Sequence, residues 1–286
     1  MKPRALIIYN PMAGSKLSTF KKEMIFEILK AEGWEHDFFE TQKTEKQPLE
    51  PFAKNHYDKI VVSGGDGTVS EVISFMVHHK IKAPLIILPQ GSANILAVSL
   101  KIPLNPKSAL KMGLKNEAKA LDVMNVNGKY HGMIAVGLGY DSLVMEQTTR
   151  QMKRKWGVLA YLSTILKTIF FYRGQPYKLN VDGKREVVYA KALMVFNLLP
   201  LGKTSVAEYL VGNQVHENDG ELNVAALNPR PVLDKLFIRR RMKVFSGKKI
   251  VIQQKNKGTF HIDGDVHQGK TVTVEVIPRA VNIIHP

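Results

Sequence analysis

Strand-like runs alternate with segments of helical periodicity along the first 125 residues of the chain. Four runs have the length and residue types of strands: residues 5–9, 34–40, 59–63 and 85–88. Apolar residues three or four positions apart predict three helices, at about 18–32, 69–78 and 93–100. Strands that alternate with helices are typical of a parallel sheet with helices on both faces. The first part of the chain is therefore predicted to be an α/β domain.

The pattern changes near Asp122, beyond which strand-like runs are joined by tight turns. Asn127-Gly128 and Asp182-Gly183 each separate two such runs, and these dipeptides favour the two-residue turns of β-hairpins. Further strands are predicted at 177–181, 186–196, 222–227, 249–254 and 271–277. One helix-like insertion falls at about 156–171. The second part is therefore predicted to be a mainly antiparallel β-sandwich.

Together the two patterns predict a two-domain protein, α+β overall. The length of 286 residues agrees with this, because single domains usually have about 100–200 residues. We place the α/β domain at residues 1–123 and the β-rich domain at 124–277. The C-terminal segment, about 278–286, is able to return to the first domain.

Net charge is the informative feature of the composition. Lys and Arg number 41 against 25 Asp and Glu, a net charge of +16 that favours anionic partners such as nucleic acid, phosphorylated ligands or an acidic membrane surface. The absence of Cys excludes disulfide scaffolds, thiol catalysis and Cys-ligated metal sites, and it fits a reducing compartment. Residues 156–172 are the best transmembrane candidate, but Lys167 interrupts them. A transmembrane helix needs about 20 apolar residues, so we predict that this segment does not span a membrane.

Unusual loops follow all four predicted strands of the α/β domain: residues 10–14, Thr41, residues 64–68 and residues 89–94. In an open parallel sheet these loops emerge at the carboxyl edge, where ligands bind. Their glycines and small polar residues let backbone N–H groups approach an anion, and the helices that follow add positive N-terminal ends. One such loop is more often a simple turn. Four loops at one edge indicate a phosphate-binding crevice.

Three of these loops carry a resemblance to a known family: Asn10-Pro-Met-Ala-Gly14, Gly64-Gly-Asp-Gly-Thr68 and Pro89-Gln-Gly-Ser-Ala-Asn94. They resemble the N-terminal motifs of the diacylglycerol/sphingosine kinase-like lipid kinases, whose nucleotide domain is related to NAD kinases and phosphofructokinases. The resemblance continues in Gly137-Leu-Gly-Tyr-Asp141, Asn218-Asp-Gly-Glu-Leu222 and Asp263-Gly-Asp265. Neither the P-loop nor the standard dinucleotide fingerprint occurs.

The resemblance implies a kinase that transfers the γ-phosphate of ATP to a lipid hydroxyl, with ATP in the inter-domain crevice and Mg²⁺ as cofactor. The lipid is of a diacylglycerol or sphingoid type, and its identity stays open. The implied nucleotide-binding residues are Asn10, Pro11, Gly14, Lys16, Thr41, Gly64, Gly65, Asp66, Gly67, Thr68, Ser92 and Asn94. Lys16 could pair with a phosphate, although a solvated loop Lys is an equal alternative. Asp66 could hold Mg²⁺, directly or through water.

Two acids of the last motif are the expected catalytic pair. Asp263 and Asp265 are two residues apart, so on an extended segment they would project to the same side and raise each other's pKa. By resemblance the second acid is the general base, so we expect Asp265 to be the base with Asp263 assisting. Asp265 stands where the family usually has Glu, a side chain one methylene longer. A surface Asp-Gly turn is the alternative for this segment taken alone.

A structural Mg²⁺ site is implied at the segment that resembles the family's metal motif. Asp219 would supply a side-chain oxygen, and the carbonyl groups of His216 and Glu221 would complete the share of the protein. Asn218 stands where that motif usually begins with Asp.

Two basic stretches of the β-rich domain, residues 147–181 and 229–260, are poor in acids. They favour peripheral contact with an anionic membrane, although solvated faces would explain them too. The expected location is therefore cytoplasmic, at the inner membrane surface, with a homodimer left open. Two other functions stay open: an NAD kinase-like or other soluble-substrate kinase, and a non-catalytic binder of anionic lipid or nucleic acid. No DNA-binding motif is present, so no nucleic-acid partner is expected.

Overall fold

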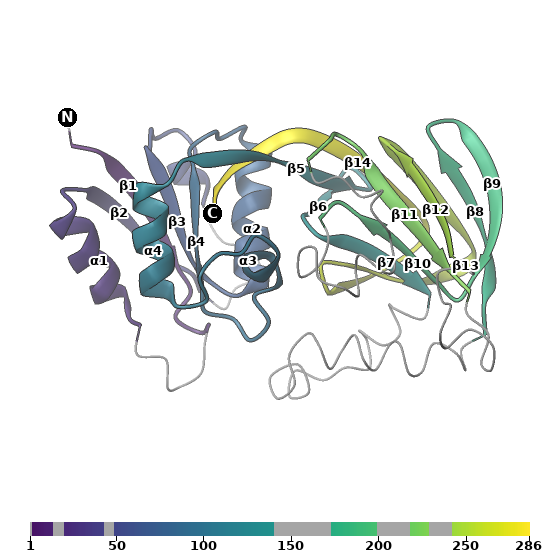
Figure 1. Ribbon diagram of the computed structural model, residues 1–286, viewed down its shortest axis with the longest axis horizontal. Helices are drawn as coiled ribbons and strands as arrows, with labels where there is room; N and C mark the ends of the chain where they lie inside the picture. The colour runs from purple at the N-terminus through teal and green to yellow at the C-terminus, as the bar shows by residue number, and fades with distance from the viewer. Residues whose placement is uncertain (1, 14–19, 43–48, 140–172, 199–217, 229–241) are drawn as a thin grey trace. The chain divides into compact units, whose positions relative to one another are not determined.

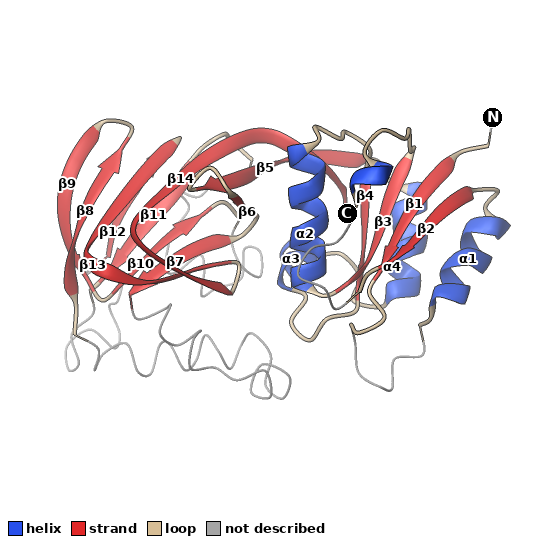
Figure 2. Ribbon diagram, turned by 180° about the vertical axis from the view of Figure 1, so that it is seen from behind, coloured by secondary structure: helices blue, strands red, loops and turns tan. Residues whose placement is uncertain are grey.

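The computed structural model describes residues 2–13, 20–42, 49–139, 173–198, 218–228 and 242–286. The chain divides into two compact units. The first consists of Met1–Leu121 and Arg279–Pro286, and the second of Asp122–Pro278. All described helices belong to the first unit, whereas the described elements of the second unit are strands (Figure 2).

The first unit is built on a parallel sheet, with the strand order β4-β3-β1-β2 (Figure 1). These strands are β1 (Arg4–Tyr9), β2 (Glu35–Glu40), β3 (Lys59–Gly64) and β4 (Leu85–Pro89). Each neighbouring pair is parallel, and the end of β14 (Asp265–Ile284) lies parallel to β4 through Ile283 and Leu85. The carboxyl ends of the four strands therefore meet at one edge, as the alternating pattern predicts.

The helices of this unit pack on an aliphatic sheet. They are α1 (Lys22–Ala31), the short 3-10 helix η1 (Glu50–Phe52), α2 (Asp66–His78), α3 (Ile95–Ser99) and α4 (Pro106–Lys115). Helix α4 is not among the predicted helices, although the sequence at its start carries a capping signal. The Asn105 side chain accepts a 3.1 Å hydrogen bond from the Ser108 N–H, and Pro106 occupies the first turn.

Asp37 on β2 ties together the starts of neighbouring strands. The Nη2 atom of Arg4 donates hydrogen bonds to both oxygens of the Asp37 carboxylate, at 2.8 and 2.9 Å. The hydroxyl of Tyr57 donates a further bond of 2.6 Å. The Tyr57 bond, followed by the Arg4 bond and charge, holds the pKa of Asp37 below its ordinary value against the opposing effect of burial.

The second unit is antiparallel. Its strands are β5 (Ala118–Val126), β6 (Tyr130–Gly132), β7 (Ala135–Gly139), β8 (Gln175–Val181), β9 (Lys184–Ala190), β10 (Ala192–Phe196), β11 (Leu222–Leu227), β12 (Met242–Gly247), β13 (Lys249–Ile262) and β14. The main path runs β12-β11-β10-β7-β13-β14, and hairpins β5–β6 and β8–β9 pair with β14 and β13.

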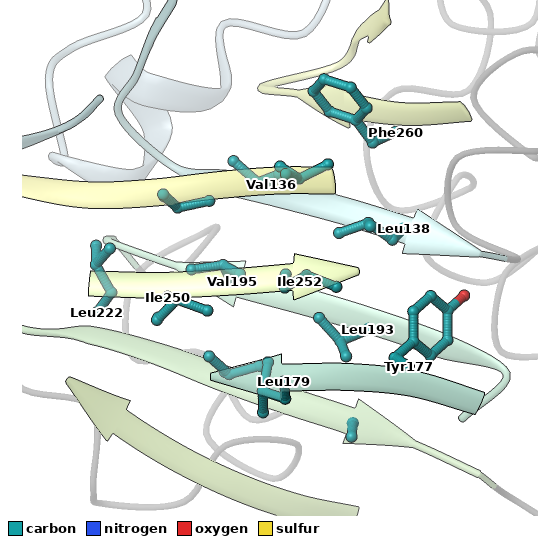
Figure 3. Close-up of a cluster of buried hydrophobic side chains, with 14 of the residues drawn as sticks. Val136, Leu138, Tyr177, Leu179, Leu193, Val195, Leu222, Ile250, Ile252 and Phe260 are labelled. Atoms are coloured by element: carbon teal, nitrogen blue, oxygen red, sulfur yellow. The ribbon is translucent and has the colours of Figure 1, made fainter. Parts of the chain in front are cut away.

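Inward-facing residues of these strands form one core. Side chains from β7, β8, β10, β11 and β13 gather in it, including Val136, Leu179, Leu193, Leu222 and Ile252, which are at most 2% exposed (Figure 3). On β8 the residues between them are at least partly exposed, as strand alternation predicts, whereas β7, β10 and β11 are buried along almost their whole length.

These features confirm the predicted fold class, a mostly parallel α/β part followed by an antiparallel sandwich-like part. The predicted strand 186–196 is in fact two strands, β9 and β10, which break at Lys191. Within the residues that the structure describes, no helix is long and apolar enough to cross a membrane. The helix-like insertion at 156–171, together with Gly14, Lys16 and His216, lies outside the described residues.

Candidate functional site

The glycine-rich loops of the first unit are linked by side-chain hydrogen bonds at the carboxyl edge of the sheet. The amide of Asn10, which follows β1, donates a 2.7 Å bond to the hydroxyl of Thr68 in the first turn of α2. The amide of Gln90, which follows β4, donates to the hydroxyl of Ser63 at the end of β3. Both acceptors are buried. The loops after β1, β3 and β4 therefore form one connected layer.

Gly65 and Gly91 bring two of these loops into backbone contact. A Cβ placed on Gly91 would lie 2.6 Å from the Cα of Gly65, and a Cβ placed on Gly65 would lie 3.2 Å from the Cα of Gly91. The second loop is closed on itself by Asn94, whose amide group exchanges bonds with the N–H and C=O of Gly91 at 2.8 and 2.9 Å. Glycine is required here because the backbones touch.

Asp66 joins the same two loops. Its carboxylate lies near the backbone N–H groups of Ile95, Leu96 and Asn94, at the start of α3. Burial raises the pKa of Asp66, and these N–H groups act in the opposite direction. Asp66 therefore lies where the loop after β3 meets the loop after β4.

Gly67 differs from its neighbours because it faces open space. No atom lies within 4 Å of a Cβ placed there, whereas a Cβ on Gly64 would meet Thr68 at 2.6 Å. Helix α2 starts at Asp66, and its N-cap residue, Gly65, provides no side-chain cap. A 13-residue helix whose positive end opens beside a bare glycine is suited to a phosphate group.

Three other expected nucleotide-binding residues are placed separately. Pro11 and Ser92 are exposed in their loops. Thr41 is 7% exposed, and its N–H bonds to the carbonyl of Tyr9 at 2.8 Å. The structure thus places these residues at the same edge as the glycine loops without joining them by any described side-chain bond.

In the second unit, Asp263 lies in a turn and not on an extended strand. Asp263 and Gly264 join β13 to β14, with φ angles of +49° and +98° respectively. Because this segment is not extended, the side chains of Asp263 and Asp265 do not project to the same side as expected. The carboxylate of Asp263 accepts three backbone N–H bonds, from Met133 at 2.6 Å and from Ile134 and Ala135 at 2.9 Å. Burial raises the pKa of Asp263. Three of the roughly four lone-pair sites of this carboxylate are therefore used by backbone N–H groups of the protein.

The same arrangement occurs at two other hairpins whose turns the structure describes in this unit, β5–β6 and β8–β9. Asn127 and Asp182 also have positive φ, and each side chain accepts N–H bonds from a neighbouring strand, at 2.8 to 2.9 Å. Each N–H in turn donates to that strand, as the N–H of Asp263 donates to Ala135. Asp263 therefore has the role of a turn-docking residue, the role that Asn127 and Asp182 also have.

Asp265 begins β14 and is exposed. It pairs with Ile262 across the hairpin, and His267, two residues later, pairs with Phe260. The His267 ring lies 5.4 Å from the Phe260 ring and 4.4 Å from that of Tyr130. Burial lowers the pKa of His267, and the charge of Asp265 acts against this shift. Asp265 is therefore an available carboxylate on a hairpin held by Asp263 and by packed rings.

The expected metal segment is an exposed turn that ends at β11. Asn218 and Gly220 have positive φ, at +66° and +76°. The carboxylate of Asp219 is exposed and accepts the N–H of Glu221 at 3.0 Å. Among the described residues, no three acidic or His side chains gather as a metal cluster. The exposed carboxylates described at this turn are those of Asp219 and Glu221.

A buried polar network connects this turn to the hairpin of Asp265. The N–H of Gly220 donates to the carboxylate of Asp122 at 2.8 Å. The amide of Asn197 donates at 2.9 Å to the carbonyls of both Asp122 and Met133. Met133 in turn donates its N–H to Asp263. Asp122 and Asn197 are each 3% exposed, so the network is shielded from water.

Sequence reasoning did not identify Gln90, Asn197 or Asp122 as site residues. Gln90 lies within the Pro89–Asn94 motif, and this position could have identified it as a site residue. Asn197 and Asp122 carry no signal of their own, because their partners are backbone carbonyl and N–H groups of distant segments.

Comparison with known protein families covers nearly the whole chain. The family model of the diacylglycerol kinase catalytic domain matches residues 4–126. The model of the YegS C-terminal NAD kinase beta sandwich-like domain matches residues 134–285. Two relatives from Staphylococcus aureus, strains Mu3 and Newman, carry the name "Putative lipid kinase". Each is 26% identical over 280 residues, which are 94% of this chain and 88% of the relative.

Solved structures show the same fold. A crystal structure of a "putative diacylglycerol kinase" from Bacillus anthracis str. Sterne has a TM-score of 0.81 and 23% identity, over 100% of this chain and 97% of that chain. A second structure, of a diacylglycerol kinase from the same organism, has a TM-score of 0.77 at the same identity and coverage. At this identity the similarity establishes the fold alone.

Proposed function

We propose that this chain, which belongs to the diacylglycerol kinase-like family of lipid kinases, transfers the γ-phosphate of ATP to the hydroxyl group of a lipid. One observation carries the proposal beyond family membership. The loops of Gly65 and Gly91 are locked together, while Gly67 beside them is open at the positive end of α2. This arrangement is suited to phosphate groups, such as those of ATP.

In this proposal the first unit binds the phosphates of ATP through its backbone. The N–H groups at the start of α2 would donate to phosphate oxygens, and the helix dipole adds to the attraction. Asn10 would act indirectly, because its side chain holds Thr68. A backbone cradle of this kind positions a phosphate without needing a large local positive charge.

We propose Asp265 as the general base. The lipid hydroxyl oxygen attacks the γ-phosphorus, the bond from that phosphorus to the β,γ-bridging oxygen breaks, and ADP leaves. The carboxylate of Asp265 accepts the hydroxyl proton. The exposure of Asp265 supports this assignment, and the three N–H bonds to Asp263 argue for a positioning role for that residue.

Bound Mg²⁺ would neutralise the charge that develops on the phosphates during transfer. Asp219 fits an Mg²⁺ ligand because its carboxylate is exposed and one N–H bond leaves lone pairs for a hard cation. The carbonyls of His216 and Glu221 stay predictions as the remaining ligands. The Asn197 network would keep this turn in register with the hairpin of Asp265.

The test is incubation with labelled ATP and Mg²⁺ in the presence of lipid alcohols, namely diacylglycerol, a sphingoid base and phosphatidylglycerol. We expect label on one lipid, loss of transfer with EDTA, and a loss of about 100-fold or more in Asp265→Asn. Glu27→Gln, another exposed acid, is the matched control and should keep full activity. Transfer to NAD with none to lipids would replace the proposal with an NAD kinase-like function. No transfer to any acceptor would leave a non-catalytic binder.

A lipid substrate requires contact with a membrane. We therefore propose that the protein acts at the cytoplasmic surface of the inner membrane, bound peripherally. The net charge of +16 supports an anionic surface as its partner.

A further inference from the structure

One outward face of the second unit combines cations with exposed apolar side chains. On β9, Val187 is 63% exposed and Tyr189 is 56% exposed, whereas Val188 between them and Ala190 after them are buried. Two such side chains on one strand are unusual for a surface in water, because exposed aromatic and aliphatic groups gain from leaving water.

Strand registry shows which residues share this face. Val187 pairs with Lys178 on β8, which pairs with Gln253 on β13. In the next row Arg185 pairs with Asn180, and Tyr189 pairs with Pro176. We call this set the β8–β9 face: Pro176, Lys178, Arg185, Val187, Tyr189 and Gln253. A hollow of about 570 Å³ lies on it, lined among others by Lys178, Arg185, Asn180 and Gln253.

The rows of this face contain no acid, although Glu186 also lines the hollow, and the nearest acids are paired with lysines. Glu186 bonds to Lys243 at 2.8 Å, and Glu275 bonds to Lys249. The positive charge continues beyond the face into a bulge of β13. There the register shifts between Gln253 and Gly258, and Lys255, Lys257 and, on β14, Lys270 are exposed. The described charges of this region are therefore predominantly positive.

We propose that the β8–β9 face docks on an anionic lipid bilayer. Lys178 and Arg185 would contact lipid phosphates, with the amides of Asn180 and Gln253 as additional donors. Tyr189 and Val187 would enter the boundary between headgroups and acyl chains, where aromatic and aliphatic side chains are favoured. The apolar pair favours a bilayer over nucleic acid, and the like charges oppose a second copy of the chain. This inference rests on the proposed function in that a lipid kinase must meet its substrate at a membrane.

Flotation with vesicles tests the proposal on the full chain. We expect binding to phosphatidylcholine vesicles that contain phosphatidylglycerol, little binding to phosphatidylcholine alone, and weakening at high salt. Removing Lys178 and Arg185 with Gln substitutions should lower partitioning by roughly 30-fold, at about fivefold per charge. Val187→Ser with Tyr189→Ser should lower it at every salt concentration. The matched control, Lys107→Gln with Lys111→Gln and Leu104→Ser, alters exposed residues at or near α4 and should bind like the parent.

Equal loss in the control would show that total charge and not this face binds the vesicles, and would overturn the proposal. So would unchanged vesicle binding in the face variants, or a loss of duplex DNA binding without a loss of vesicle binding. Activity separates the two proposals. With a lipid alcohol in neutral detergent micelles, the face variants should match the parent, because docking is bypassed. If the parent itself transfers no phosphate while the vesicle result holds, the kinase proposal fails and the docking face stands.

Discussion

The Cα of Gly65 and the Cα of Gly91 approach so closely that no side chain fits between them. Gly91→Ala would place its Cβ 2.6 Å from Gly65 and 2.8 Å from the Asn94 side chain, so a backbone must shift. We expect a loss of about 1–3 kcal/mol in the free energy of unfolding. Thermal unfolding should show a Tm lower by several degrees, at roughly 2–4 °C per kcal/mol.

Gly67→Ala is the matched control, because the added methyl group meets no atom within 4 Å. Its Tm should be equal to or higher than that of the parent, because Ala is favoured over Gly within a helix. Since the open space is assigned to ATP phosphates, the same change should raise KM for ATP by about tenfold. A lowered Tm in Gly67→Ala, or an unchanged KM, would contradict this assignment.

The position of these loops could be predicted from the sequence, but their contact could not. Strands β1, β3 and β4 are marked by aliphatic runs and β2 by the pair Phe38-Phe39, and parallel pairing brings their carboxyl ends to one edge. Whether Gly65 meets Gly91 depends on how two loops curve after their strands. Neither the composition nor the periodicity of those loops encodes that curvature.

We expect Asp263 to contribute to stability and Asp265 to contribute to catalysis. Asp263→Asn replaces an acceptor oxygen by an NH₂ group that faces an N–H donor, which should cost about 2–3 kcal/mol. Asp265→Asn changes an exposed side chain and should leave the Tm within about 1–2 °C while activity falls. Thermal unfolding and transfer assays on both variants check this. The reverse result, with a stable but inactive Asp263→Asn, would make Asp263 the general base.

The error over Asp263 has a specific physical origin. Asp182-Gly183 was recognised as a turn because strand-like runs flank it on both sides. Asp263-Gly264 carries the same signal, but the strand prediction for β13 stopped at residue 254, whereas the strand continues to Ile262 after a bulge. Bulges break the alternation on which strand prediction relies. The backbone N–H groups of Met133 to Ala135, which receive Asp263, are invisible to any residue-type pattern.

Replacing Asn197 should lower kcat by more than the loss of stability alone explains. Asn197→Ala leaves the carbonyls of Asp122 and Met133 without their donor, at a cost of about 2–3 kcal/mol. Asn223→Ala is the control, since that side chain is equally buried and bonds to Ser246. Both variants should have a lower Tm, but kcat should fall only in Asn197→Ala, with KM for ATP unchanged. Equal kcat values would reduce the network to a purely structural role.

Asp37 should make the free energy of unfolding depend on pH in the acid range. Its folded-state pKa is lowered by Tyr57 and Arg4, so the unfolded chain binds this proton more tightly than the folded chain. The stabilisation is therefore complete above the unfolded pKa of about 3.9 and is lost as the pH falls through the lower folded value. It amounts to about 1 kcal/mol or less, because Arg4 is half exposed. Asp37→Asn should lower the Tm by a few degrees at pH 7, and the difference from the parent should shrink below about pH 4. A difference that stays constant into that acid range would show that the carboxylate charge contributes nothing and that only packing was lost.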